Sequence, residues 1–200
     1  LLQQEVAGPI LEMLKGAMDT LVVGDPADRR TDIGPVIDAA ARERLMQYLA
    51  RQAGRILHQL DVPAEGEFVP PSILRLDSIE ELTEEWFGPI LHVVTWGSGD
   101  LERVVEQVNA SGYGLTMGLH SRIQGVAASV CRQARVGNLY VNRAMIGAVV
   151  GAQPFGGEGL SGTGPKAGGP HYLPRFAVER AISIDTTSSG GNASLLSIGD

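Results

Sequence analysis

The sequence predicts an α/β fold in which a mostly parallel sheet is covered by helices. Three observations support this class. Short apolar runs of strand length alternate with amphipathic segments of helical length, as in parallel sheets. A composition with 44% hydrophobic and 20% charged residues is that of a globular protein. The 200 residues also suffice for a core, because a chain of this size buries roughly 70% of its unfolded surface.

Two helices are expected in the first quarter of the chain. The first should have Pro9 in its opening turn, where a missing amide hydrogen is tolerated, and should end at residues 22–26. Its apolar face repeats at helical spacing through Ile10, Met13, Leu14, Ala17, Met18 and Leu21. The second should follow Asp38 and end at Gly54, with an apolar face formed by Ala41, Leu45, Tyr48 and Leu49.

The middle of the chain alternates strands with helices. Asp100 is the expected N-cap of a helix, since its carboxylate can accept the free amides of the first turn. One side of this helix carries Leu101, Val104, Val105 and Val108. Another helix should run from about Arg122 to Arg135. The expected strands are 56–59, 68–75, 90–96, 113–120 and 137–142.

The last third has a different character. Glycine dominates residues 143–174, yet Phe155, Leu160 and Tyr172 are unusual in a solvated linker, so a long ordered loop is expected. This loop is the most promising functional surface. Residues 177–186 predict a late strand, and residues 187–200 form a Ser/Gly-rich tail.

Composition narrows the function classes. A net charge of −7 without a basic run argues against nucleic acid or an anionic membrane as a partner, because both need clustered Lys and Arg. The single cysteine excludes an internal disulfide framework and favours a reducing, cytoplasmic compartment. No apolar run has the length of a membrane span, and Leu1 begins without a signal-peptide profile, so a piece of a longer protein is expected.

Neither a nucleophile nor a metal site is evident. Cys131 lies on the apolar stripe of its helix, which predicts a buried structural thiol. The stripe also contains Ile123, Val126, Ala127, Val130 and Ala134. The four histidines lack the short, paired spacing of metal ligands, so no metal site is expected.

Residues 157–162 spell the dinucleotide fingerprint GxGxxG. That motif requires a helix behind it, so that the pyrophosphate meets the helix N-terminus. The Gly/Pro-rich run 162–170 follows instead, and the match is therefore interpreted as chance. A phosphate loop is excluded because Pro165 replaces its lysine. Ser161 is no nucleophile elbow because Thr163 stands where that motif has glycine.

Glu85 and Phe87 are stronger candidates. A carboxylate and an aromatic ring two residues apart, entering the turn at Gly88 and Pro89, present acceptors beside a flat apolar surface. Such groups can hold a sugar diol and a heteroaromatic ring. The more ordinary alternative, an exposed loop acid beside a core phenylalanine, stays open on these residues alone.

Short motifs are spread in order over essentially the whole chain: residues 24–26, 31–35, 84–90, 109, 113–115, 137–142 and 153–157. Together they resemble the aldehyde dehydrogenase superfamily. The run from Asn142 to Pro170 resembles more closely the pyrroline-5-carboxylate dehydrogenase module of the bifunctional flavoproteins called proline utilization A. The resemblance implies the aldehyde dehydrogenase catalytic-domain fold and NAD-dependent oxidation of glutamate semialdehyde, which arises from pyrroline-5-carboxylate in proline catabolism, to glutamate.

The resemblance also implies roles for individual residues. Glu85 would bind the ribose hydroxyls of the nicotinamide half of NAD, and Phe87 and Leu115 would line the nicotinamide pocket. On the substrate side, the amides of Gly147 and Ala148 would anchor the carboxylate, since consecutive N–H groups bind an anion without a counter-charge.

Phe155 would pack against the aliphatic chain of the aldehyde. The implied division is a catalytic domain over residues 1–176, an oligomerisation strand over 177–186 and a C-terminal tail over 187–200. In the family, the nucleophilic cysteine lies shortly before the segment that begins here at Leu1. The general base, the oxyanion-stabilising asparagine and the Rossmann domain lie further upstream.

The chain alone is therefore expected to be inactive and to form one wall of the site of a homo-oligomeric parent. FAD is implied only for a proline dehydrogenase domain upstream, if the parent has one. A non-catalytic binding or assembly domain with the same fold is the alternative.

Overall fold

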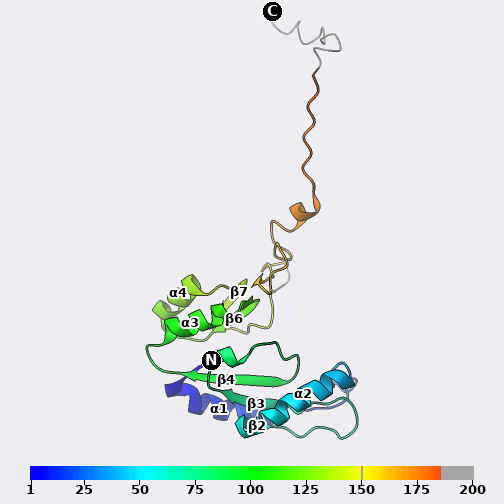
Figure 1. Ribbon diagram of the computed structural model, residues 1–200, viewed down its shortest axis with the longest axis vertical. Coiled ribbons are helices and arrows are strands. Elements are labelled where there is room, and N and C mark those ends of the chain that lie inside the picture. The colour runs from blue at the N-terminus through cyan, green and yellow to red at the C-terminus, as the bar shows by residue number, and fades with distance from the viewer. Residues whose placement is uncertain (150, 186–200) are drawn as a thin grey trace, which may run out of the picture.

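The larger part of the fold is a four-stranded sheet in the order β1-β4-β3-β2 (Figure 1). The structure is a computed structural model that describes residues 1–149 and 151–185. β1 (Leu2–Gln3) and β3 (Ser72–Leu76) run parallel to the central strand β4 (Ile90–Trp96). Only β2 (Ile56–Gln59) is antiparallel to its neighbour, so the predicted mostly parallel sheet is confirmed.

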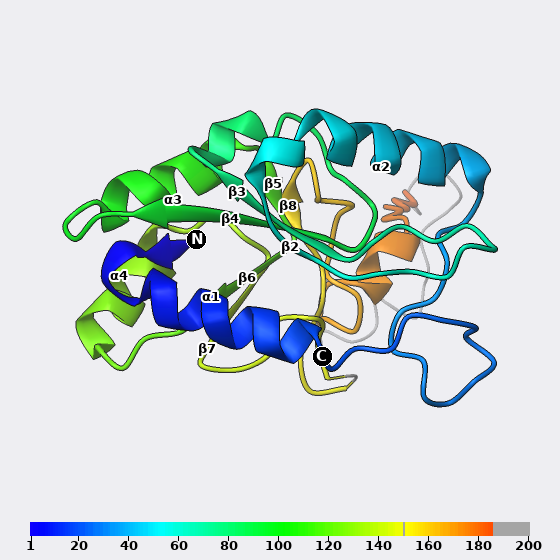
Figure 2. The same cartoon turned by 90° about the horizontal axis from the view of Figure 1, so that it is seen from below.

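A smaller unit follows in the chain. β6 (Thr116–Leu119) and β7 (Asn138–Val141) form a parallel pair, and β5 (Tyr113–Gly114) is antiparallel to β8 (Glu158–Gly159). Helices α3 (Leu101–Ala110) and α4 (Gln124–Gln133) lie beside this unit in both views (Figures 1 and 2).

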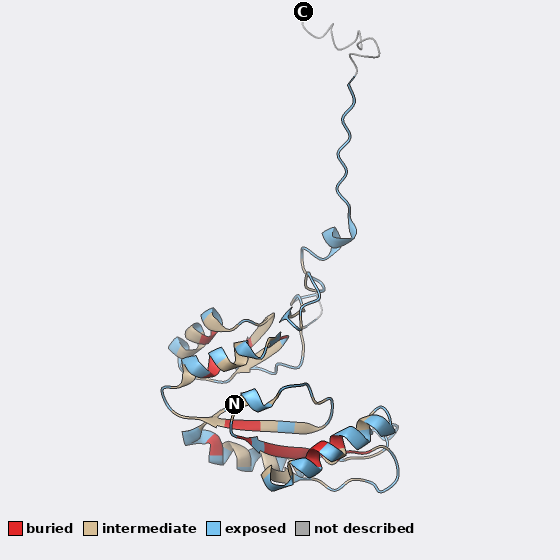
Figure 3. Cartoon of the chain, viewed as in Figure 1, coloured by how far each residue is buried: buried red, intermediate tan, exposed pale blue. Residues whose placement is uncertain are grey.

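The main core lies between the helix α2 (Ala39–Arg51) and the sheet. Asp38 caps this helix, because its carboxylate accepts the amide of Ala41 at 2.7 Å. The predicted apolar face is buried: Leu45, Tyr48 and Leu49 pack with Val69 and Leu74. Figure 3 shows the buried segments concentrated on α2, β3 and β4.

Two helix starts differ from the prediction. α1 (Gln4–Met18) continues directly from β1, so Pro9 lies inside the helix and not in its first turn. Pro9 lacks the amide that would bond Glu5 one turn earlier. Asp100 does stand at the start of α3, but its carboxylate makes no cap and accepts from Arg103 Nη2 at 3.2 Å instead.

The predicted strand 113–120 is two strands with different partners. Gly114 closes β5 and Thr116 opens β6, and the chain changes sheet between them. Gly114 must be glycine, because a Cβ there would lie 2.5 Å from the carbonyl oxygen of Arg135. Alternation of apolar residues alone could not reveal this change of partner.

The expectation for Cys131 is wrong, because its side chain is exposed. α4 buries Val130 fully and Val126 in part. Cys131 follows Val130 by one residue and is therefore turned about 100° around the helix axis, out of the packed face. The apolar residues of α4 thus cover a wider part of the helix surface than the face that packs against the rest of the protein.

Residues 177–185 lead away from the strands (Figure 1). After the short 3-10 helix η3 (Leu173–Phe176), residues 177–185 are exposed and assigned to neither helix nor strand. A strand that pairs with a second copy would have no partner in one chain, so the predicted strand 177–186 stays a prediction. The predicted tail 187–200 lies outside the described residues. No described helix is long and apolar enough to cross a membrane.

Candidate active site

The motif at residues 84–90 is anchored by its tryptophan. Trp86 stacks on Tyr48 of α2, with ring centroids 3.9 Å apart and an interplanar angle of 15°. Glu85 and Phe87, on either side of Trp86, are exposed. Gly88 follows where a Cβ would lie 2.6 Å from Leu45 Cδ1, so a larger residue there would force the buried Leu45 side chain to shift.

Glu85 and Leu115 line one pocket of about 410 Å³, although thirty residues separate them in the sequence. Ile79 and Leu82 add apolar surface to its lining, and Ser161 comes from the glycine-rich loop. The pocket thus combines two carboxylates, of Glu84 and Glu85, with an apolar surface. The fold therefore brings together two of the three residues expected at the cofactor.

Phe87 lies apart from them. Its ring is 74% exposed and lines a second pocket with Val36, Ile37 and Leu45, beside α2. Phe87 and Leu115, which were expected to line one nicotinamide pocket, therefore line two different pockets here.

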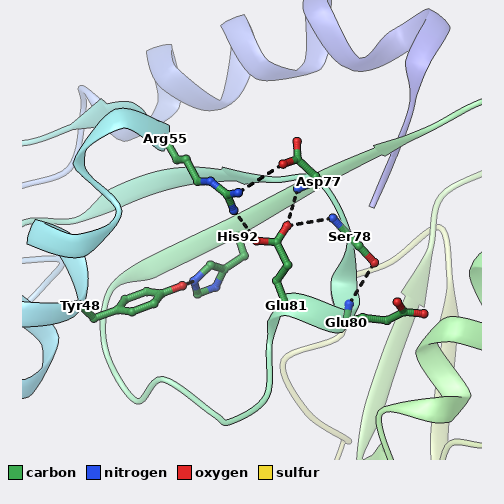
Figure 4. A network of polar contacts seen from close by, with 7 residues as sticks. All are labelled: Tyr48, Arg55, Asp77, Ser78, Glu80, Glu81 and His92. Atoms are coloured by element: carbon green, nitrogen blue, oxygen red, sulfur yellow. Dashed lines mark hydrogen bonds and ion pairs between the residues drawn. The ribbon is translucent and has the colours of Figure 1, made fainter.

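A polar network fixes the 3-10 helix η2 (Ile79–Glu81), which contributes Ile79 to the lining of the pocket. Ser78 and Glu81 form a capping box, and the Glu81 carboxylate also pairs with Arg55 (Figure 4). Asp77 donates its amide to Glu81 at 2.8 Å and accepts from Arg55 at 3.2 Å. The Arg55 guanidinium and then the two backbone amides lower the pKa of Glu81.

Backbone hydrogen bonds hold the described part of the glycine-rich loop, in line with the ordered loop that the sequence predicts. Phe155 and Ala167 exchange backbone hydrogen bonds of 3.0 and 2.9 Å, which brings the two arms of the loop together. Phe155 is half-buried there. Lys166 also donates to the carbonyl of Gly137, next to Asn138 at the start of β7.

Gly147 and Ala148 lie in an irregular, half-buried segment of this loop. Among the described residues, no hydrogen bond engages their amides. The next amide, that of Val149, donates to the side chain of Gln153 at 3.2 Å, and Gln153 returns its own amide to the Val149 carbonyl at 3.0 Å. The backbone amides of Gly147 and Ala148 therefore have no acceptor among the described residues, and the hydrogen bonds between Val149 and Gln153 hold the backbone next to them.

The GxGxxG run has no dinucleotide-binding geometry. β8 pairs with β5, Ser161 and Gly162 close tight turns, and the next helical segment of the chain is η3 at Leu173. The Ser161 hydroxyl accepts the amide of Gly114 at 3.2 Å, so it shapes the loop. The interpretation of the match as chance is confirmed.

Asn138 is a structural residue of the site that the sequence reasoning missed. Its side chain holds Pro154 and Gly156 of the glycine-rich loop, on both sides of Phe155. In the sequence, Asn138 stands within the motif 137–142 and near the expected start of a strand, where an amide is unusual. Its partners lie 16 and 18 residues away and cannot be read from the sequence.

Comparison with known proteins identifies the family of this chain. The aldehyde dehydrogenase family matches residues 1–182. This chain belongs to the aldehyde dehydrogenase family. The bifunctional protein PutA of Klebsiella aerogenes is 54% identical over 189 residues, which cover 90% of this chain and 14% of that protein.

Other relatives are single enzymes and solved structures. A 1-pyrroline-5-carboxylate dehydrogenase of Geobacillus is 36% identical over 185 residues, covering 90% of this chain and 36% of the relative. The crystal structure of Bradyrhizobium japonicum PutA superimposes with a TM-score of 0.87 at 52% identity, covering 93% of this chain and 19% of that one. Thermus 1-pyrroline-5-carboxylate dehydrogenase with bound NAD gives a TM-score of 0.78 at 35% identity.

The family assignment therefore agrees with the motifs, and this aldehyde dehydrogenase chain spans only a fraction of each relative.

Proposed function

We propose that this chain forms the nicotinamide and substrate-anchoring wall of an NAD-dependent dehydrogenase that oxidises L-glutamate γ-semialdehyde to L-glutamate in proline catabolism. The observation that carries the proposal is the pocket shared by Glu85 and Leu115. A free carboxylate beside an apolar wall suits a ribose diol next to a flat ring. The relatives named PutA and 1-pyrroline-5-carboxylate dehydrogenase support the choice of substrate.

The residues present fit the nicotinamide half of NAD. Within the described residues, no hydrogen bond or ion pair engages the Glu85 carboxylate, so both of its oxygens are available to hydroxyl donors. Leu115 would exclude water beside the ring. NAD, when bound, would supply the hydride acceptor. The residues of this chain would hold and orient the cofactor, with Phe87 contributing from the second pocket.

The glycine-rich loop supplies the substrate side. Glutamate semialdehyde carries a carboxylate far from its aldehyde carbon, and the amides of Gly147 and Ala148 would receive that carboxylate. Phe155 would pack on the methylene groups between. Fixing the far end of the substrate places the reacting carbonyl, which is how remote binding energy contributes to rate.

The chemistry itself requires groups beyond this wall. The only thiol, Cys131, lies on the outer face of α4 and does not line the pocket. We therefore propose that the 200 residues alone do not oxidise aldehydes. The single cysteine accords with a cytoplasmic reaction. The exposed residues 177–185, with Val178, Ile182 and Ile184, would pair with a second copy.

The test uses the complete enzyme that contains this chain. Ala148→Pro removes one donor, and an unpaired carboxylate oxygen costs about 1 to 3 kcal/mol. The KM for glutamate semialdehyde should rise far more than the KM for propionaldehyde, which has no carboxylate. Ala148→Gly keeps the amide and is the matched control. An equal rise for both aldehydes in a folded Ala148→Pro enzyme would show that this loop does not recognise the carboxylate.

A further inference from the structure

Arg44 and Tyr48 both contact the motif around Glu85 from one face of α2. Tyr48 stacks on the Trp86 ring at 3.9 Å, and the Arg44 guanidinium carbon lies 4.7 Å from the centre of the same ring. Arg44 Nη2 also binds the Glu84 carboxylate at 2.6 Å. The residues immediately before and after Glu85 are therefore both held by a helix some forty residues away in the chain.

The stack is tied to the sheet as well as to α2. The Tyr48 hydroxyl shares a hydrogen bond of 2.9 Å with Nε2 of His92, which lies in the central strand β4 (Figure 4). Tyr48 is buried, and burial lowers the pKa of His92, so the imidazole is held in its neutral form. The Tyr48 ring, which stacks on Trp86, is therefore held by its place on α2 and by the hydrogen bond of its hydroxyl to His92.

Glu85 has no such anchor of its own. No hydrogen bond or ion pair with another described residue restrains its side chain, so its position follows from its two neighbours. We propose that Arg44 and Tyr48 are positioning residues, which hold Glu84 and Trp86 and thereby aim Glu85 at the nicotinamide ribose. This inference rests on the proposed function of Glu85. It adds two residues that lie outside the pocket and that no sequence motif identified.

The test is a double-mutant cycle in the complete enzyme. Tyr48→Leu removes the stack and should raise the KM for NAD roughly three- to tenfold, while the KM for the aldehyde changes little. Tyr48→Phe keeps the stacked ring and should restore most of the NAD affinity. Combined with Glu85→Gln, Tyr48→Leu should raise the KM for NAD no further, because both changes act through one carboxylate.

Gln47→Ala is the matched control, since Gln47 is exposed on α2 and bonds only Glu43 on that helix. If Tyr48→Leu prevents folding, Arg44→Gln takes its place in the cycle, because Arg44 is half exposed. Additive effects of the two changes, or an equal rise in both KM values, would overturn the positioning role while leaving the function of Glu85 intact. A silent Glu85→Gln would instead refute the proposed function, and the positioning role with it.

Discussion

Asn138 ties the strand β7 to the glycine-rich loop at Pro154. Its Nδ2 donates to the Pro154 carbonyl at 3.0 Å, and its Oδ1 accepts the amide of Gly156 at 3.2 Å. One side chain therefore satisfies the backbone on both sides of Phe155. The ring that would pack against the substrate is placed by an amide outside the loop.

Replacing Asn138 by alanine should loosen this loop. Each lost hydrogen bond contributes about 0.5 to 1.5 kcal/mol, so the free energy of unfolding should fall by about 1 to 3 kcal/mol. Asn138→Asp keeps the acceptor for Gly156 but sets a second acceptor against the Pro154 carbonyl, so it should not restore the lost stability. Denaturant unfolding of the complete enzyme measures both changes, and an unaltered midpoint for Asn138→Ala would show that the bonds do not hold the loop.

A methyl group at Gly137 should be far less tolerated than one at Gly125. A Cβ on Gly137 would overlap the carbonyl oxygen of Gly156, and backbone cannot move aside as a flexible side chain can. At Gly125, inside α4, nothing lies within 4 Å, so Gly125→Ala should be neutral or stabilise by up to about 1 kcal/mol. Thermal unfolding of both variants is the comparison, and equal melting temperatures would contradict the close approach.

Acid should remove the contribution of Glu81. Arg55 and two amides lower its pKa below the ordinary value of 4.5, so the charged form favours the folded state. That contribution is complete above pH 4.5 and is lost as the pH falls through the lowered pKa of the folded state.

Glu81→Gln should therefore reduce the melting temperature at about pH 7 and make a smaller difference at about pH 3. Glu102→Gln, on the exposed side of α3, serves as the control. A melting-temperature difference that is the same at both pH values would show that the ionised carboxylate of Glu81 does not stabilise the fold.

The sequence predicted elements well where one local pattern decides them. The strands 56–59 and 90–96 have the predicted bounds, and Asp38 caps α2 where a carboxylate before an apolar face indicates a helix. The prediction from the sequence was wrong where a feature depends on contacts with residues far away in the chain. Cys131 fits an apolar stripe by spacing, but which part of that stripe packs depends on the neighbours of α4.

The site divides in the same way. Glu85 and Leu115 were identified by their motifs, yet their common pocket depends on how β5 and β6 are placed beside η2. Phe87 was placed with them by motif and faces another pocket. Asn138, Arg44 and Tyr48 have partners 16 or more residues away, which no local pattern reveals.

Glu85→Gln in the complete enzyme tests the central claim most directly. The change keeps the shape of the side chain but removes the charge that strengthens its hydrogen bonds to ribose hydroxyls, each contributing about 1.5 to 3 kcal/mol. Single-turnover formation of NADH from glutamate semialdehyde should slow by roughly tenfold or more, and the KM for NAD should rise. Unchanged NAD kinetics together with an unchanged single-turnover rate would contradict the assignment of Glu85 to the cofactor.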